Sequence, residues 1–167
     1  IRYDYGSDRY FLAGTAQNNN SNNSNNKKFG WIERRDYDAD LDSNPPSPSS
    51  STEWSVKIED TNGQNTANID TTLRAMESYG NELVVVGKTG NVPWIAKYNN
   101  NGGIVWSSTS NTADVEYTGV CKGGTNYYAC GSTAVSGDAV SFVEKFDSNG
   151  NPGWGKSATM LGRDVVL

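Results

Sequence analysis

Short apolar runs that stop at a glycine occur three times along the chain, and each is followed by a second apolar segment that begins with an aromatic residue. The first kind of segment is Tyr10–Gly14, Leu83–Gly87 and Tyr127–Gly131, and the second kind is Trp31–Arg35, Trp94–Tyr98 and Phe142–Phe146. Each unit then ends at a tryptophan, which is Trp54, Trp106 or Trp154. Runs of this length between turn residues are typical of strands, and no window keeps a helical apolar period over several turns. The pattern therefore predicts a repeat built of short strands.

Polar turns divide each unit into two hairpins. The turns are Gly80-Asn81 and Gly124-Thr125 in the first hairpins, and Tyr98–Gly103 and Phe146–Asn151 in the second hairpins. Asparagine and glycine stand where such turns need a positive φ. The spacing from Trp94 to Trp106 equals the spacing from Phe142 to Trp154. Four strands in a repeat of about 44 residues is the size of one β-propeller blade.

We therefore expect an all-β, β-propeller-like fold with about three four-stranded antiparallel blades and the first strand of a fourth. The expected units are residues 1–58 with insertions at 16–28 and 36–52, residues 72–110, residues 116–158, and the start of a fourth unit at 163–167.

The order of these elements resembles the propeller repeats of the SBBP type, which are common in bacterial and protist surface proteins. The resemblance covers nearly the whole chain apart from the two insertions, and it implies the fold but no activity, because propellers carry many unrelated functions. Three blades are too few to close a ring, so we expect further blades of the same polypeptide or other protein chains as partners. The chain begins at Ile1 without an initiator methionine and stops at Leu167 within an apolar run, which indicates a processed product or a stretch of a longer polypeptide.

The composition disfavours several classes of function. The net charge of the 167 residues is −5, whereas binding to a nucleic-acid backbone needs clustered Lys and Arg, so no nucleic-acid partner is expected. Histidine is absent, which removes the commonest general base and nearly every zinc site, and we therefore expect no enzyme. No apolar stretch approaches the length of a membrane span.

The first insertion is an asparagine-rich tract that cannot bury apolar surface. Within it, Asn19-Asn20-Ser21 and Asn22-Asn23-Ser24 fit the acceptor pattern for N-glycosylation, which makes Asn19 and Asn22 candidate glycan sites. The alternative is a plain flexible loop, because such matches arise easily in a tract of this composition.

The second insertion begins with four alternating aspartates, Asp36, Asp38, Asp40 and Asp42. Alternating carboxylates in a loop can gather a hard cation, so these residues are candidate calcium ligands. An EF-hand is excluded because Leu41 stands where that loop needs a glycine. The alternative is a solvated face of a strand extension that binds no metal.

The same insertion ends in a Ser/Pro tract whose composition favours an extended polyproline conformation. Its residues are Pro45, Pro46, Ser47, Pro48, Ser49, Ser50 and Ser51. The tract resembles the O-glycosylated, hydroxyproline-bearing stretches of algal and plant wall glycoproteins, and this resemblance implies an extracellular, structural setting. A plain spacer loop is the alternative.

Cys121 and Cys130 flank the turn around Thr125-Asn126 and are predicted to lie opposite each other in a hairpin. Directly opposed antiparallel residues can have Cα atoms close enough for a disulfide, which would indicate an oxidising compartment. Two reduced thiols are the alternative.

The aromatic residues allow two interpretations, because Trp and Tyr faces also stack on sugars. Their recurrence at one position in every unit favours packing between repeats instead. Glu33 and Glu144 also occupy equivalent repeat positions, so they do not suggest the carboxylate pair of a glycosidase.

Together these features favour a non-enzymatic scaffold, extracellular or at the cell surface, with a structural or adhesive role in a cell-surface or filamentous assembly. Its insertions would be glycan-bearing loops that contact partners. The alternative is a carbohydrate- or calcium-dependent binding module, a lectin-like propeller that uses the Asp36–Asp42 segment.

Overall fold

The computed structural model describes residues 1–4, 9–17, 28–36, 52–58, 70–111, 115–135 and 138–158. The regular elements among them are strands, and these form three antiparallel sheets of four strands each. The expected all-β class and the antiparallel sheets are therefore confirmed for these residues. The same part of the chain has no helix long and apolar enough to cross a bilayer. The expected start of a fourth unit at 163–167 lies outside the described residues.

The strands of each sheet follow one another in the chain and across the sheet. The first sheet contains β1 (Arg2–Asp4), β2 (Arg9–Gln17), β3 (Lys28–Asp36) and β4 (Thr52–Ile58). The middle sheet contains β5 (Thr71–Tyr79), β6 (Glu82–Thr89), β7 (Val92–Asn99) and β8 (Ile104–Thr109). The third sheet contains β9 (Glu116–Gly123), β10 (Asn126–Val135), β11 (Asp138–Phe146) and β12 (Pro152–Ala158).

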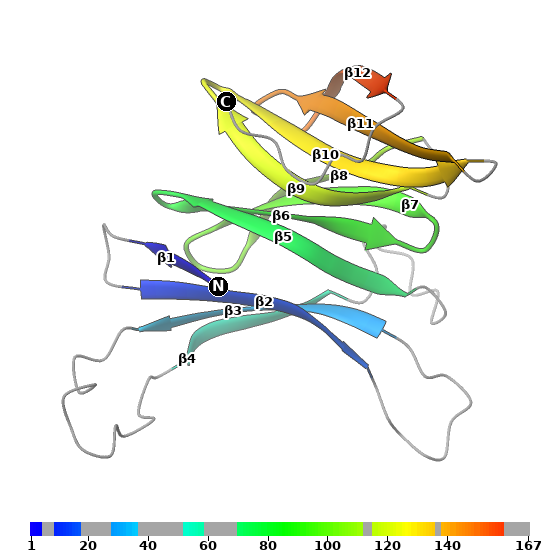
Figure 1. Ribbon diagram of the computed structural model, residues 1–167. Coiled ribbons are helices and arrows are strands. Elements are labelled where there is room, and N and C mark those ends of the chain that lie inside the picture. The colour runs from blue at the N-terminus through cyan, green and yellow to red at the C-terminus, as the bar shows by residue number, and fades with distance from the viewer. Residues whose placement is uncertain are drawn as a thin grey trace.

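The three sheets stack face to face, with the middle sheet between the other two (Figure 1). An apolar core fills each of the two spaces between them. The first core joins Phe11 and Ile32 of the first sheet to Leu83, Val85 and Trp94 of the middle sheet, and each of these side chains is buried. Each core therefore belongs to two sheets, and neither sheet could bury its face alone.

Strand β6 contributes to both cores because successive side chains of a strand point to opposite faces. Leu83 and Val85 pack in the first core, whereas Val84 and Val86 pack in the second. The third sheet contributes buried side chains to the second core, namely Tyr117, Val120, Tyr127, Ala129 and Phe146. A strand covered on both faces needs apolar residues at every position, which explains the uninterrupted run before Gly87.

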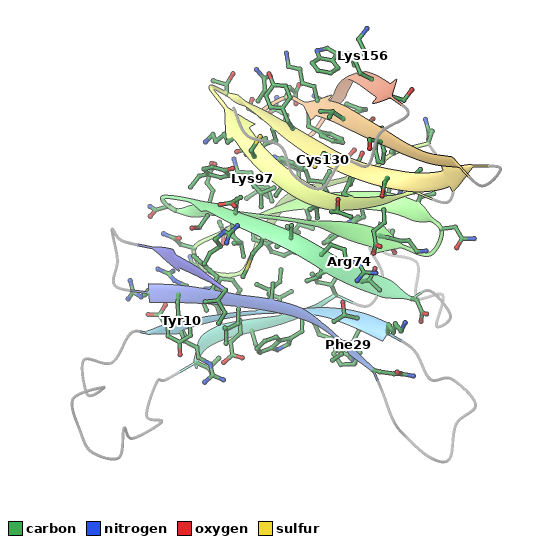
Figure 2. All side chains as sticks on the ribbon, viewed as in Figure 1. Tyr10, Phe29, Arg74, Lys97, Cys130 and Lys156 are labelled. Atoms are coloured by element: carbon green, nitrogen blue, oxygen red, sulfur yellow. The ribbon has the colours of Figure 1, made fainter. Side chains whose placement is uncertain are left out.

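The stack of described strands is open at both ends. Tyr10 and Phe29 lie on the face of the first sheet that points away from the middle sheet, and Lys156 lies on the outer side of the third sheet (Figure 2). The three sheets do not close into a ring.

A β-bulge occurs beside the glycine that ends the apolar run of the second strand in the middle and third sheets. The pairing of β5 with β6 skips Arg74 next to Gly87, and the pairing of β9 with β10 skips Thr118 next to Gly131. Both bulges lie at equivalent positions of the repeat, so they are a shared feature of the middle and third sheets.

The bulge brings a backbone carbonyl into the space where a side chain would begin. A Cβ on Gly87 would lie 1.9 Å from the Thr72 oxygen, and a Cβ on Gly131 would lie 2.1 Å from the Glu116 oxygen. Only glycine fits at these two positions. Gly14 of the first sheet differs, because a Cβ there would meet no atom within 4 Å.

Replacing Gly87 with alanine is expected to lower the free energy of unfolding by about 2–4 kcal/mol, because backbone atoms must move to admit the methyl group. Gly14→Ala is the matched control and should change stability by less than about 1 kcal/mol, in the stabilising direction. Urea unfolding followed by circular dichroism measures both values. Similar effects of the two substitutions would contradict the steric explanation.

Candidate functional site

The turn between β7 and β8 is held by one asparagine side chain. The Oδ1 atom of Asn99 accepts hydrogen bonds from the backbone N–H groups of Asn101 and Gly103, each at 2.9 Å. The Gly102 N–H donates to the Asn99 carbonyl at 3.1 Å, and the Asn99 N–H donates to the Gly103 carbonyl at 2.9 Å. This closed set of bonds keeps the turn compact without help from another sheet.

The turn between β11 and β12 repeats this pattern with an aspartate. The Oδ1 atom of Asp147 accepts from the N–H groups of Asn149 at 2.8 Å and Asn151 at 2.9 Å, and the Gly150 N–H donates to the Asp147 carbonyl at 3.1 Å. Hydrogen bonds from the side chain and backbone of Asn151, with those of Asn149 and Gly150, lower the pKa of Asp147. The carboxylate is therefore ionised at neutral pH and holds the turn in the same shape.

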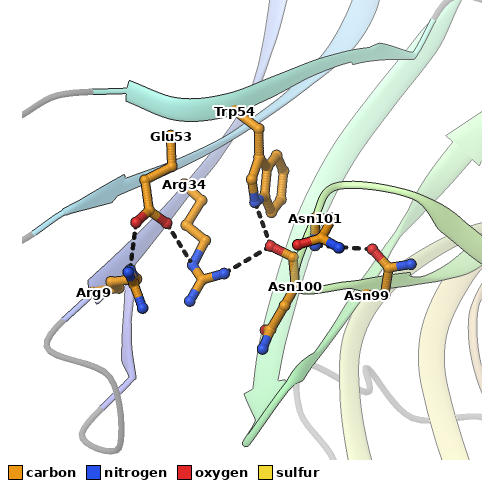
Figure 3. Close-up of polar contacts among 7 residues, drawn as sticks. All are labelled: Arg9, Arg34, Glu53, Trp54, Asn99, Asn100 and Asn101. Atoms are coloured by element: carbon orange, nitrogen blue, oxygen red, sulfur yellow. Dashed lines mark hydrogen bonds and ion pairs between the residues drawn. The ribbon is translucent and has the colours of Figure 1, made fainter.

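A tryptophan of the preceding sheet docks on each turn. We call the contact region between the first and middle sheets the first junction, and that between the middle and third sheets the second junction. At the first junction the indole N–H of Trp54 donates to the backbone oxygen of Asn100 at 2.6 Å, and the Arg34 guanidinium donates to the same oxygen at 2.7 Å (Figure 3). The indole ring lies against Gly102, where a Cβ would approach the ring to 2.8 Å. Gly102 also has a φ of 75°, so backbone conformation and ring together exclude a side chain. We name the indole hydrogen bond and the ring–glycine packing the tryptophan–turn contact.

The second junction repeats the tryptophan–turn contact. The indole N–H of Trp106 in β8 donates to the backbone oxygen of Ser148 at 3.0 Å. Gly150 has a φ of 81°, and a Cβ there would lie 2.5 Å from the Trp106 ring. The ring also packs edge-on against Tyr127, with centroids 5.5 Å apart. Each contact therefore joins the last strand of one sheet to the last turn of the next.

The charged groups beside the two contacts differ. At the first junction Glu53 of β4 pairs with Arg9 at 2.6 Å and with Arg34 at 3.2 Å (Figure 3). These pairs link strands within the first sheet, while the guanidinium of Arg34 also reaches the middle sheet through Asn100.

The second junction holds a cluster around Glu82, the first residue of β6. The carboxylate binds Lys97 at 2.5 Å, accepts a hydrogen bond from the Tyr127 hydroxyl at 2.9 Å, and lies 3.3 Å from the Lys122 ammonium. Lys97 lies between the middle and third sheets (Figure 2). Burial raises the pKa of Glu82, but the bonds from Lys97, Tyr127 and Lys122 lower it by more, so the pKa is below its usual value. Burial and the Glu82 carboxylate raise the pKa of Tyr127 to about 12.

The third tryptophan of the repeat, Trp154 in β12, has no turn to dock on among the described residues. It is 45% exposed, whereas Trp54 and Trp106 pack against the two cores. Its ring contacts Tyr128 of its own sheet at a centroid distance of 6.2 Å. No residue in the described ranges accepts a hydrogen bond from its indole N–H.

The prediction that Cys121 and Cys130 lie opposite each other is wrong. The turn between β9 and β10 consists of Gly124 and Thr125, one residue earlier than the turn on which that prediction depended. The ladder consequently pairs Cys121 with Tyr128 and Cys130 with Gly119. A turn shifted by one residue moves every opposed pair by two residues, so the cysteines are diagonal neighbours and no disulfide joins them. The cysteines therefore give no support to an oxidising compartment.

Most of the other predicted site residues lie outside the described residues. They are Asp38, Asp40 and Asp42, Asn19 and Asn22, and residues 45–51. Asp36 ends β3, but its side chain is not among those described. Calcium binding and glycosylation stay predictions. Within the described ranges, no three His, Cys, Asp or Glu side chains lie together as ligands for a metal ion.

Glu33 and Glu144 lie in the first and third sheets, with the middle sheet between them. Glu33 is buried and accepts hydrogen bonds from Arg35 and from the Thr52 hydroxyl, the latter at 2.6 Å. Glu144 accepts a hydrogen bond from the Tyr117 hydroxyl at 2.5 Å. Each carboxylate is therefore bound within its own sheet, and the middle sheet separates the two.

Among the surface hollows that involve more than one sheet, two exceed the hollow of about 200 Å³ between β1, β2 and β5. The larger, of about 500 Å³, is lined by Lys28, Asp70, Thr72, Arg74, Lys88, Gly90, Asn91 and Glu116. The smaller, of about 360 Å³, is more apolar and is lined in part by Trp94 and Tyr98. Those two side chains are 0% and 3% exposed, so their faces are not available for stacking on a sugar.

The sequence predicted the tryptophans and the turns separately but did not predict that one binds the other. The acceptors are the backbone oxygens of Asn100 and Ser148, which leave no side-chain pattern. The signal that could have revealed the contact is the presence of one Asx-x-Asn-Gly turn and one tryptophan in both the second and the third unit. The Glu82 cluster was missed because its members come from four different strands.

No protein-family model matches the sequence, and no curated protein matches it. The function is therefore inferred from the contacts described above.

Replacing Gly150 with alanine is expected to lower the free energy of unfolding by about 2–4 kcal/mol, because the positive φ and the Trp106 ring both oppose a Cβ. Gly124→Ala is the matched control, since Gly124 has a φ of 62° but no atom within 4 Å of the added carbon. That control should cost only about 1 kcal/mol. Urea unfolding followed by tryptophan fluorescence measures both, and equal losses would show that the ring contact contributes nothing.

The free energy of unfolding is expected to fall in acid because the Glu82 carboxylate becomes protonated. A carboxylate whose folded pKa lies below its unfolded value, near 4.5, contributes stability that is present above that value and is lost as the pH falls through the folded pKa. Glu82→Gln should therefore lower the free energy of unfolding at pH 7. Between about pH 5 and pH 2 this free energy should fall less in Glu82→Gln than in the original chain. Tyr127→Phe, which keeps the carboxylate and Lys97, should retain most of the acid dependence. Chemical unfolding at a series of pH values tests this, and parallel profiles for the original chain and Glu82→Gln would contradict it.

Proposed function

We propose that this chain is a segment of a β-propeller that serves as a non-enzymatic structural or adhesive scaffold outside the cell. In this role it belongs to a cell-surface or filamentous assembly, and its two insertions are glycan-bearing loops. Its partners are further blades of the same polypeptide, other protein chains, or glycans.

The observation that carries the proposal is the tryptophan–turn contact, which occurs at both described junctions with the same donor group, the same kind of acceptor and the same glycine packing. A residue that recurs to hold one repeat to the next is a structural element of a repeat protein. Trp54 and Trp106 therefore serve in packing between the sheets. A stack joined in this way can be lengthened without changing any existing joint, which suits a scaffold.

The order of contacts between the sheets supports a propeller arrangement. The first strand of each later sheet, β5 or β9, packs against the preceding sheet. The last strand of each earlier sheet, β4 or β8, reaches the last turn of the following sheet. Contacts at both edges keep successive four-stranded sheets face to face, as in propeller blades, and ring closure would need blades beyond these three.

The buried carboxylates favour a structural role over a catalytic one. Glu33 joins neighbouring strands of one sheet, and Glu82 joins the middle sheet to the third. Glu144 accepts its hydrogen bond from a tyrosine of its own sheet. Glycoside hydrolysis typically needs two carboxylates on either side of one bond, and each of these three is bound to different partners.

The carbohydrate- or calcium-dependent binding module is the less favoured function. Its calcium form depends on the Asp36–Asp42 sequence pattern alone. Its carbohydrate form needs an accessible aromatic face in a hollow. Trp94 and Tyr98, which line the more apolar hollow, are buried, and the exposed Trp154 lines neither of the two hollows described above.

The intact mass of the natively produced chain tests the proposal. The sequence accounts for 18.1 kDa, and glycans on Asn19, Asn22 or the Ser/Pro tract would add to this value. We expect a larger mass that falls on enzymatic deglycosylation. The double variant Asn19→Gln/Asn22→Gln is the matched control, since it should lose only the N-linked part. A native chain of the unmodified mass would overturn the extracellular, glycan-bearing role and favour an interaction scaffold inside the cell.

A further inference from the structure

We infer that the outer face of the third sheet at Trp154 is a docking surface for a further four-stranded repeat, bound through a compact turn of the Asx-x-Asn-Gly type. The inference rests on the proposed scaffold function, because it names the partner through which the scaffold is extended. Tyr128, Lys145 and Trp154 form this surface, which we name the Trp154 surface.

Trp154 already has the geometry of a docked tryptophan. The ring of Trp54, which is docked, lies 6.0 Å from the Phe11 ring at an interplanar angle of 50°. The ring of Trp154 lies 6.2 Å from the Tyr128 ring at 55°. Phe11 and Tyr128 are equivalent, because each stands three residues before the glycine that ends its apolar run. The Trp154 ring is therefore already held against Tyr128 of its own sheet, so the binding of a turn loses little side-chain entropy.

Lys145 supplies a second donor at the position of Arg34. Each of these cations pairs, in the ladder between the second and third strands of its sheet, with the aromatic residue that contacts the tryptophan. At the first junction Arg34 and Trp54 both donate to the Asn100 carbonyl. Lys97 at the equivalent position of the middle sheet binds Glu82 instead, but the third sheet has Asn126 at the place of Glu82. Lys145 is therefore placed, like Arg34, to share one carbonyl of an incoming turn with Trp154.

The exposure of Trp154 indicates that its partner is missing from the described stack. Ile1, Ile104 and Val105 are the other large hydrophobic residues exposed in the described ranges, so Trp154 is the aromatic member of this set. The equivalent Trp54 and Trp106 pack against cores. A large aromatic ring in water, at a position where its equivalents are covered, marks an interaction site.

A second copy of this chain does not offer a turn of the right kind. Its turns at 99–103 and 147–151 are already covered by its own Trp54 and Trp106. The corresponding segment of the first unit, between β3 and β4, comprises residues 37–51 and contains no glycine for the ring to pack against. Head-to-tail joining of two copies cannot reproduce the tryptophan–turn contact. The occupant is therefore a separate repeat that carries its own uncovered turn.

The test extends the full chain at Leu167 by a second copy of residues 120–158. With this junction the added turn stands as many residues after Trp154 as the turn of the third sheet stands after Trp106. The readout is hydrogen exchange of the Trp154 indole N–H by NMR, with the signal identified by its loss in Trp154→Phe. Exchange should be about tenfold slower in the extended chain than in the original chain, which corresponds to about 1.4 kcal/mol of protection.

The matched control carries Gly150→Ala in the added copy alone. The turn of the third sheet is then unchanged, and the added turn can no longer accept the ring. The Trp154 indole should exchange at the rate measured in the original chain. In the extended chain with the intact turn, Lys145→Met should leave Trp154 partly protected, because one of the two donors to the carbonyl is lost.

Three results would overturn the inference. One is an unchanged Trp154 exchange rate in an extended chain whose added segment is folded by circular dichroism. Another is an added segment that stays unfolded, since the Trp154 surface should supply the face on which it packs. The third is self-association of the original chain that disappears in Trp154→Ser, because the occupant would then be a second copy. None of these outcomes depends on glycans, so failure here is distinguishable from failure of the proposed function.

Discussion

The hydrogen bond from the Trp54 indole to the Asn100 carbonyl, repeated from Trp106 to Ser148, determines how each sheet sits on the next. Burial of apolar side chains supplies most of the attraction between the sheets, but it is not directional. The indole bond and the ring–glycine packing are directional, because both need one donor, one carbonyl and one residue without a side chain. The cores therefore hold the sheets together, while the tryptophan–turn contact selects a single arrangement of them.

This contact gives the stack a direction. Each joint consists of a tryptophan on one sheet and a turn on the following sheet, so the two ends of the stack cannot be alike. Glycine is required in an inner strand and in the last turn of these sheets for the same reason, which is the close approach of a neighbouring group. Gly87 and Gly131 admit a carbonyl of the adjacent strand, and Gly102 and Gly150 admit the ring of the preceding sheet.

The charged residues vary from one junction to the next, whereas the tryptophan and the glycine do not. Arg34 reaches the carbonyl of the neighbouring turn, but Lys97 at the equivalent position binds Glu82 instead. The indole hydrogen bond and the ring–glycine packing are made at both junctions whichever partner the cation has, so the ion pairs can differ without loss of the architecture. The long insertions fall in the connections from β2 to β3 and from β3 to β4, which separates variable segments from the strands that assemble.

The sequence by itself determined the all-β class, the four strands of each sheet and the glycine turns, because apolar runs, glycines and aromatic spacing are local signals. It did not determine the register around Cys121 and Cys130, since one residue in a turn decides which residues face each other. Nor could it reveal the tryptophan–turn contact, whose acceptors are backbone carbonyls of another sheet. Trp106 and Trp154 occupy the same place in the repeat, yet one is covered and the other is 45% exposed. Only the tertiary structure decided that difference, because burial depends on whether a neighbouring sheet is present and not on the residue itself.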